Sequence, residues 1–437
     1  MGGGGDEEMG NASDLLDASS RSLDNIICRD RYARGDGCGD GEIREVAKEI
    51  ISKMDELLDG DEPELELSGA SRAQCLSIKG RSLHFWGTKC KDKDKLRDAL
   101  ELLMKAVKLL PQDSAAWNAA GECLWTLGDV DGACECFESS ASHAENAEAY
   151  RLHSMCARKL GGSTAAQKME HLTKSMQLAK QALALNFQDG ESWYVLGNAY
   201  LASFFAVSHQ TKGQEDLENA VKAYNRAESI MRESGLMNPD VLYNRGQVHR
   251  WLEMYEKAAE DYRRAHARDP SLAADVEAAR IERRVARVTD FARRKGKIKK
   301  KRFESAVSGL RSRLGADLPP ARIATLAEGK NPSESIALTL LMPLNSDSDP
   351  PISFLAADAS GDVCAISVYH IDASACASLK MQSKDAITVR SPHVRRAQNY
   401  PVLLQAFNPS QFLVNGAPLS SSKYYAHAAL ATNILSS

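Results

Sequence analysis

SAAWNAAGECLWTLGDVDGACECFESSA, residues 114–141, is the stretch that decides the fold of this chain. Counted from its start, Trp117 is the fourth residue, Gly121 the eighth, Ala133 the twentieth and Phe137 the twenty-fourth. Small residues at the eighth and twentieth positions let two helices approach closely, and the aromatic residues wedge between neighbouring copies. The stretch therefore predicts a pair of packed helices that is one unit of a repeat.

The same frame recurs along the chain. Residues 190–201 and 217–228 supply the two halves of another copy, residues 239–270 form a complete one, and looser copies lie in 75–111 and 148–185. The matching positions are Leu76, Gly80, Ala99, Ala106, Tyr150, Ala157, Trp193, Gly197, Tyr200, Ala220, Tyr224, Leu242, Gly246, Ala258 and Tyr262. A period of about 34 residues with this pattern is typical of tetratricopeptide repeats. We expect at least four of them, stacked into an all-α superhelix.

The repeats divide the chain into regions. Residues 1–40 are rich in Gly, Asp and Ser with little apolar periodicity, so we expect a disordered acidic tail there. Residues 41–292 are predicted to form the repeat array, which begins with a helix near Ile43 and ends in a capping helix. That helix is predicted to run from Asp275 to about Phe303, and 293–330 to hold a basic segment and a linker.

The period of the apolar residues changes to two near the C-terminus. Short β-branched runs separated by Ser, Asp, Asn, Gly and Pro predict five or six strands in residues 331–437, and Asn415-Gly416 predicts a tight turn. A small all-β barrel of the OB-fold class fits this size. The fold class is thus an all-α repeat superhelix followed by a small all-β OB-fold domain.

Several classes of function lack their sequence signals. The chain has no G-x-S-x-G, Walker A or H-E-x-x-H motif and no histidine cluster with ligand spacing, so we expect no enzyme, cofactor or metal site. No secretory signal or membrane helix is expected, and the ten scattered cysteines suit a reducing compartment. We therefore expect a cytoplasmic and nuclear protein with no membrane partner.

The inner faces of the first helices of such repeats line a concave groove. The positions predicted to face it are Asn118, Glu122, Trp125, Arg151, Met155, Arg158, Lys159, Tyr194, Asn198, Leu201, Asp240, Tyr243, Gln247, Arg250 and Trp251. This mixture of both charges with aromatic walls suits an extended peptide that carries both signs of charge. The sequence therefore predicts a peptide-binding groove.

Separated blocks of the chain resemble one family in order and spacing. DGESWYVLGNAYL, NPDVLYNR, KGKIKKKR and FLVNGAPLSSS are similar to the tetratricopeptide repeat protein 5 family, in which repeats precede an OB-fold domain. The resemblance implies recognition of the N-terminal Met-Arg-Glu sequence of nascent tubulin at the ribosome, followed by decay of the tubulin mRNA through a downstream adaptor. It also implies an alternative role as a stress-responsive nuclear cofactor that binds transcriptional coactivators.

The resemblance also suggests roles for individual residues. It implies that Asp240 meets the arginine of the nascent peptide and that Arg158 meets its glutamate; both already belong to the predicted groove. Asn198, Tyr194, Tyr243 and Arg250 complete the candidate peptide site.

The run KGKIKKKR, residues 295–302, places six positive charges in eight positions. The resemblance implies that Lys299 and Lys301 contact ribosomal RNA, whose phosphates lysine binds without regard to sequence. A nuclear import signal and a solvated helix end remain alternatives. For the barrel we expect a docking or structural role, because its few basic residues do not suit nucleic-acid binding.

Overall fold

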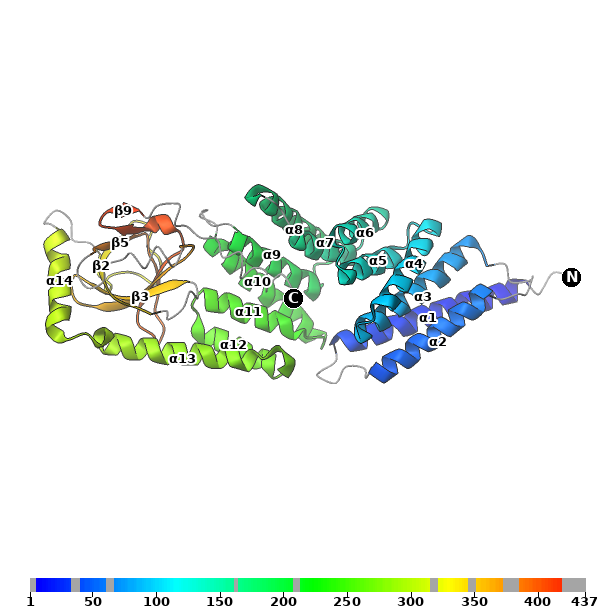
Figure 1. The fold of residues 1–437 in the computed structure, drawn as a ribbon, viewed down its shortest axis with the longest axis horizontal. Coiled ribbons are helices and arrows are strands. Elements are labelled where there is room, and N and C mark those ends of the chain that lie inside the picture. The colour runs from blue at the N-terminus through cyan, green and yellow to red at the C-terminus, as the bar shows by residue number, and fades with distance from the viewer. Residues whose placement is uncertain are drawn as a thin grey trace. The chain divides into compact units, whose positions relative to one another are not determined.

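The computed structural model describes residues 5–32, 40–59, 67–160, 164–206, 213–314, 321–344, 351–371 and 385–418 (Figure 1). The chain divides into two compact units. The first holds the described residues up to Ala199 with Lys222–Val241 and Ala267–Ser271. The second holds Tyr200–Val221, Leu242–His266 and the described residues from Leu272 onward.

Helix pairs follow one another as the repeat predicts. Their bounds are α3 Gly69–Cys90, α4 Lys93–Leu109, α5 Ser114–Leu127, α6 Val130–His143, α7 Ala147–Lys159, α8 Ala165–Leu185, α9 Gly190–Ala206, α10 Gly213–Glu233, α11 Pro239–Trp251 and α12 Tyr255–His266. The close approach expected at the eighth position is confirmed. A Cβ atom on Gly121 would lie 2.5 Å from Phe137 Cε1, and one on Gly197 would lie 2.5 Å from Tyr224 Cε1.

Gly121→Ala tests this packing. Alanine favours a helix more than glycine does, but its methyl group would overlap the ring of Phe137, which is fully buried. We expect a loss of about 1–3 kcal/mol in the free energy of unfolding, measured by denaturant titration. The control is Gly69→Ala, where a Cβ meets nothing within 4 Å and stability should not fall. Equal stability of the two variants would contradict the packing argument.

The prediction of a disordered tail over residues 1–40 was wrong for most of that segment. Helix α1 spans Gly5–Tyr32 and α2 spans Asp40–Asp59. Leu16, Leu23 and Ile26 recur at helical spacing, are buried, and pack with residues of α2 and α3. The acidic residues around this narrow apolar stripe conceal it in the average composition.

The capping helix is shorter than predicted. Helix α13 spans Ala274–Arg293 and ends where Lys295, Gly296 and Lys297 all have positive φ, at 49°, 73° and 57°. Three consecutive left-handed residues cannot continue a right-handed helix. A short 3-10 turn, η2 (Lys295–Lys297), therefore separates α13 from a further helix, α14 (Lys300–Leu314).

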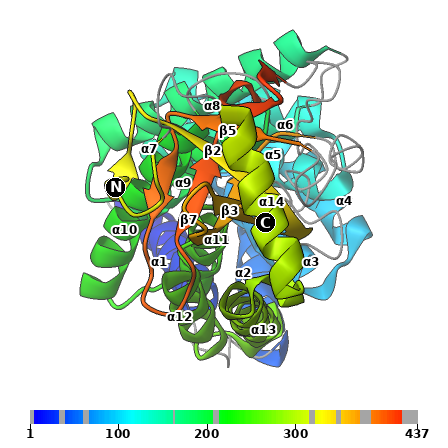
Figure 2. The same cartoon turned by 90° about the vertical axis from the view of Figure 1, so that its left-hand side faces the viewer.

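Helix α14 and part of the segment predicted as a linker belong to the C-terminal domain. Phe303 and Val307 of α14 pack with Leu341 and Leu355, and Figures 1 and 2 show α14 beside the sheet. A short strand, β1 (Gly329–Lys330), also lies in the predicted linker. The compact C-terminal structure thus begins before residue 331.

The sheet is mostly antiparallel and carries the predicted strands. The remaining bounds are β2 Ser335–Pro343, β3 Ile352–Asp358, β4 Val363–Val368, β5 Ile387–Arg390, β6 His393–Arg395, β7 Leu403–Ala406, β8 Phe412–Val414 and β9 Ala417–Pro418, with short 3-10 turns η1 (Pro270–Leu272) and η3 (Pro409–Gln411). Their order is β1-β6-β7-β4-β3-β2-β5-β8-β9, with β4 and β7 parallel. Asn415 and Gly416, with φ of 51° and 84°, form the predicted turn between β8 and β9.

Candidate peptide-binding site

Three helix starts set the register of the candidate site in the first unit. The side chain of Asn146 accepts a hydrogen bond from Ala149 N (2.6 Å) at the start of α7, and Asp189 accepts from Ser192 N (3.2 Å) at the start of α9. Asn238 accepts from Asp240 N (2.9 Å) at the start of α11. These side chains satisfy the first backbone N–H groups of each helix and so fix which residues face inward.

Arg158 is a buried cation near the end of α7. Only 8% of the residue is exposed, and its guanidinium lies 3.3 Å from Ser175 Oγ and 3.5 Å from both Ser154 Oγ and Val195 O. Burial lowers the pKa of Arg158 to about 10, and the nearby Tyr224 and Tyr194 oppose this shift. Within the described ranges, no carboxylate lies within 4 Å of its nitrogens. Its positive charge is therefore buried without a direct ion pair.

Tyr194 and Tyr224 form an aromatic wall next to Arg158. Their ring centroids are 6.1 Å apart, and the Tyr224 hydroxyl donates to Asn198 Oδ1 over 2.6 Å. Burial is the main reason that the pKa of Tyr194 is raised, and the carboxylate of Asp240 adds to the effect. Tyr194 thus lies within electrostatic reach of both Arg158 and Asp240.

Asp240 is the half-buried anion of the site. It is the second residue of α11, where the partial positive charge of the helix N-terminus favours a carboxylate. Burial raises its pKa, and the neighbouring Asp269 carboxylate raises it further. No lysine or arginine nitrogen of the described residues lies within 4 Å of this carboxylate.

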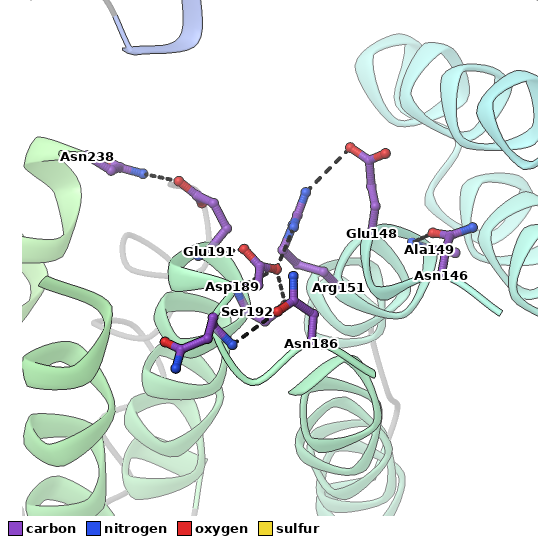
Figure 3. Close-up of polar contacts among 10 residues, drawn as sticks. Asn146, Glu148, Ala149, Arg151, Asn186, Asp189, Glu191, Ser192 and Asn238 are labelled. Carbon is purple, nitrogen blue, oxygen red and sulfur yellow. Dashed lines mark hydrogen bonds and ion pairs between the residues drawn. The ribbon is translucent and has the colours of Figure 1, made fainter. Parts of the chain in front are cut away.

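Arg151, also predicted to face the groove, has partners within the chain. Its guanidinium lies 2.9 Å from Asp189 and 3.4 Å from Glu148 (Figure 3). In the same view Asn238 Nδ2 donates to Glu191 Oε1 over 3.4 Å. Arg151 therefore holds the start of α9, which leaves Arg158 as the cation suited to an incoming anion.

Tyr243 and Arg250 lie in the second unit. The Tyr243 ring meets that of Tyr262 edge-on at 5.4 Å, and Arg250 Nη1 is 3.9 Å from Glu277 Oε2. The charge of Arg250 is thus offset inside the protein, which weakens its case as a peptide contact.

Lys299 and Lys301 are exposed at the corner between α13 and α14. Two neighbours instead cover aromatic rings: Lys295 Nζ lies 4.4 Å from the Phe303 centroid, and Lys297 Nζ lies 5.1 Å from that of Phe291. Lys300 Nζ is 3.9 Å from Glu304. Lys299 and Lys301 are therefore well placed for a contact outside the chain.

Sequence reasoning treated Tyr224 only as a packing residue. It stands at the position that Phe137 occupies in the first copy, so its extra hydroxyl is the signal that could have marked it.

The site thus combines a buried cation and a half-buried anion, both without ion-pair partners among the described residues, with Tyr194 near both. Such an arrangement suits a short peptide that carries an acidic and a basic side chain.

The described residues contain no cluster of His, Cys, Asp and Glu that could hold a metal ion. None of their helices is both long and apolar enough to cross a membrane.

Two family models match parts of the chain. Residues 317–428 match the family described as "Tetratricopeptide repeat protein 5 OB fold domain", and residues 239–272 match "Tetratricopeptide repeat". Tetratricopeptide repeat protein 5 of Mus musculus is 28% identical over 95% of this chain and 96% of its own length. The protein of the same name from Homo sapiens is 29% identical over 87% of each chain.

Solved repeat proteins give more distant matches. TTC0263, a thermophilic TPR protein of Thermus thermophilus, is 16% identical with a TM-score of 0.38, covering 46% of this chain and 98% of its own. YrrB, titled a TPR protein with an unusual peptide-binding site, is 20% identical with a TM-score of 0.31, covering 46% and 91%.

Proposed function

We propose, from the premise that this chain belongs to the tetratricopeptide repeat protein 5 family, that it is a non-enzymatic adaptor for nascent tubulin. It reads the N-terminal Met-Arg-Glu sequence as the peptide leaves the ribosome. It then recruits a downstream adaptor that starts decay of the tubulin mRNA being translated. We place this activity in the cytoplasm.

The observation that carries the proposal is the pair of opposite charges without counter-charges in the first unit. Arg158 is buried without a carboxylate, and Asp240 is half-buried without a cation, among the residues that the structure describes. A peptide with adjacent arginine and glutamate supplies both missing partners. The arginine pairs with Asp240 and the glutamate with Arg158, and the opposite sense of the two contacts fixes the peptide register.

Ribosome docking is assigned to the corner between α13 and α14. The exposed Lys299 and Lys301 provide a charge density that suits the phosphates of ribosomal RNA. Because the corner lies in the second unit and Asp240 and Arg158 lie in the first, the two contacts can be separated by mutation.

Lys299→Glu combined with Lys301→Glu is expected to release the protein from ribosomes and leave its affinity for free peptide unchanged. Each lost phosphate contact should lower the salt dependence of ribosome binding by a slope of about one. The measurement is co-sedimentation with ribosomes over a range of salt. The control is Lys108→Glu with Lys168→Glu, which changes the net charge equally at exposed sites elsewhere. Undiminished co-sedimentation at physiological salt would show that the two lysines are only solvated and do not bind the ribosome.

The exposed basic run also has the character of a nuclear import signal, which favours the second candidate function. In that role the protein is a stress-responsive nuclear scaffold that binds transcriptional coactivators through the same groove. Loss of nuclear import in the double variant, with ribosome binding intact, would favour this role over the first.

A further inference from the structure

The turn between α11 and α12 has an acidic residue where a glycine is expected. Glu253 occupies the repeat position that Gly128 holds between α5 and α6, counted from Ala258 and Ala133. The two turns have the same hydrogen bonds: Gly128 N donates to Trp125 O (3.0 Å) and Glu253 N to Arg250 O (3.0 Å). Both residues have positive φ, 99° for Gly128 and 56° for Glu253. This conformation favours glycine, so the backbone gives no reason for a glutamate.

The side chain of Glu253 supplies the reason, because it reaches the C-terminal domain. The residue is 3% exposed. Its Oε1 accepts from the hydroxyls of Ser367 (2.7 Å) and Tyr255 (3.0 Å). Its Oε2 accepts from Gln405 Nε2 (3.1 Å) and the Tyr369 hydroxyl (3.3 Å). Three of these four donors lie in or next to β4 and β7.

The same two side chains of the sheet also bind backbone carbonyls of the turn. Gln405 Nε2 donates to Leu252 O over 3.1 Å, and the single proton of the Tyr369 hydroxyl is shared between Trp251 O and Glu253 Oε2. The rings of Trp251 and Phe204 lie against Tyr369, with centroids 6.4 Å from it, and Phe407 stacks on it at 4.5 Å. These rings bury Tyr369, which contacts the carboxylate.

A partly buried arginine closes a ring of hydrogen bonds around Glu253. Arg284 of α13 donates from Nε to the Tyr255 hydroxyl (3.0 Å) and from Nη2 to Ser353 Oγ (3.1 Å). Ser353 Oγ lies 2.9 Å from Ser367 Oγ, which in turn donates to Glu253. Within the part of the chain that the structure describes, no cation lies within 4 Å of the Glu253 carboxylate. The charge is thus stabilised by hydroxyl and amide donors, with Arg284 acting through two of them.

We propose that Glu253 is a positioning residue that fastens the C-terminal barrel to the last repeat. The last repeat, α13 and the barrel then move as one body, and the barrel is not a module on a tether. Leaving a buried carboxylate or its donors without partners is costly, so the arrangement that joins them is favoured over others. This inference goes beyond the proposed function and stands whether or not the groove reads tubulin.

Whether Glu253 is only a turn residue or fastens the barrel, the two explanations predict opposite effects of Glu253→Gly on the thermal midpoint. If Glu253 is only a turn residue, glycine relieves the left-handed conformation and the thermal midpoint of the full chain rises. If it fastens the barrel, the midpoint falls, because the donors of Ser367, Tyr369 and Gln405 lose their acceptor. Hydrogen exchange should also quicken in β4, β7 and the 250–257 turn. An unchanged or higher midpoint with unchanged exchange would overturn the proposal.

Two further variants keep the test decisive. Gly128→Ala introduces a Cβ at the equivalent turn with no link to the barrel, so it should lower stability without changing exchange in β4 and β7. Ser367→Ala removes one donor from the barrel side and should quicken exchange in the 250–257 turn of the repeat. If Glu253→Gly fails to fold, this variant decides: exchange changes confined to β4 and its neighbouring strands would refute the fastening role.

Discussion

Asp240→Lys is expected to weaken binding of a Met-Arg-Glu-Ile peptide by about 30-fold to a few thousandfold, while the protein stays folded. Removing one partner of a desolvated charge pair costs about 2–5 kcal/mol, and the lysine adds repulsion toward the peptide arginine. Folding should tolerate the change, because the Asp240 carboxylate has no cation within 4 Å among the described residues, and burial beside Asp269 disfavours its charge and raises its pKa.

The measurement is fluorescence anisotropy with a labelled peptide, alongside thermal unfolding. The matched control is Asp131→Lys, since Asp131 is exposed and is likewise the second residue of its helix, α6. Both variants lose the same favourable interaction with a helix N-terminus, so only the groove distinguishes them. Equal peptide affinity for Asp240→Lys and wild type would show that Asp240 does not bind the peptide.

Arg158→Met is expected to change stability and binding in opposite directions. The guanidinium is buried without a carboxylate partner among the described residues, and burial lowers its pKa to about 10. A base whose folded-state pKa lies below its unfolded value destabilises the fold at every pH below the folded value. Methionine of similar length should therefore raise the free energy of unfolding by about 1–4 kcal/mol. Peptide affinity should fall, because the peptide glutamate then meets no cation.

The control for the expected increase in stability is Arg151→Met on the same helix. Arg151 is paired with Asp189 and Glu148, so its loss leaves a partly buried carboxylate without its partner and should lower stability. Denaturant titration and peptide anisotropy on both variants separate the cases. A peptide with glutamine in place of glutamate should bind wild type and Arg158→Met alike. Loss of stability in Arg158→Met would contradict this prediction and show that the guanidinium stabilises the fold.

The repeats could be predicted because their signal is steric and periodic. Gly121 and Gly197 are needed wherever an aromatic ring from the second helix crosses the first, so the glycine and the ring appear together in the sequence. The Asn415-Gly416 turn was predictable for a similar reason, since both residues need positive φ.

The features of the fold that the sequence did not predict have physical causes as well. The stripe of α1 is narrow, at Leu16, Leu23 and Ile26, and an acidic average composition hides it. The break after α13 places Lys295 and Lys297 at positive φ, which lysine does not signal, and Gly296 between them is the one residue of the three whose type favours that conformation. Short strands such as β1 have too few residues to show a period.

In the site, the sequence predicted which residues face inward but not their charge balance. Arg151 and Arg158 lie two turns apart on one helix, and only the fold shows that the first has carboxylate partners and that the second has none among the described residues. Glu148 lies three residues before Arg151 on the same helix, a spacing that the sequence shows, but Asp189 comes from the start of α9 and cannot be read from helix periodicity.

Selective ribosome profiling with this protein as bait tests the central claim most directly. Ribosomes captured with the protein should be enriched for tubulin messages, at positions where the first residues of the nascent chain have just left the exit tunnel. The enrichment should disappear with Asp240→Lys, which removes the carboxylate that binds the peptide arginine. It should also disappear with Lys299→Glu combined with Lys301→Glu, which removes the contact with the ribosome. Capture of ribosomes on all messages alike, or of tubulin messages by Asp240→Lys as efficiently as by wild type, would contradict the account.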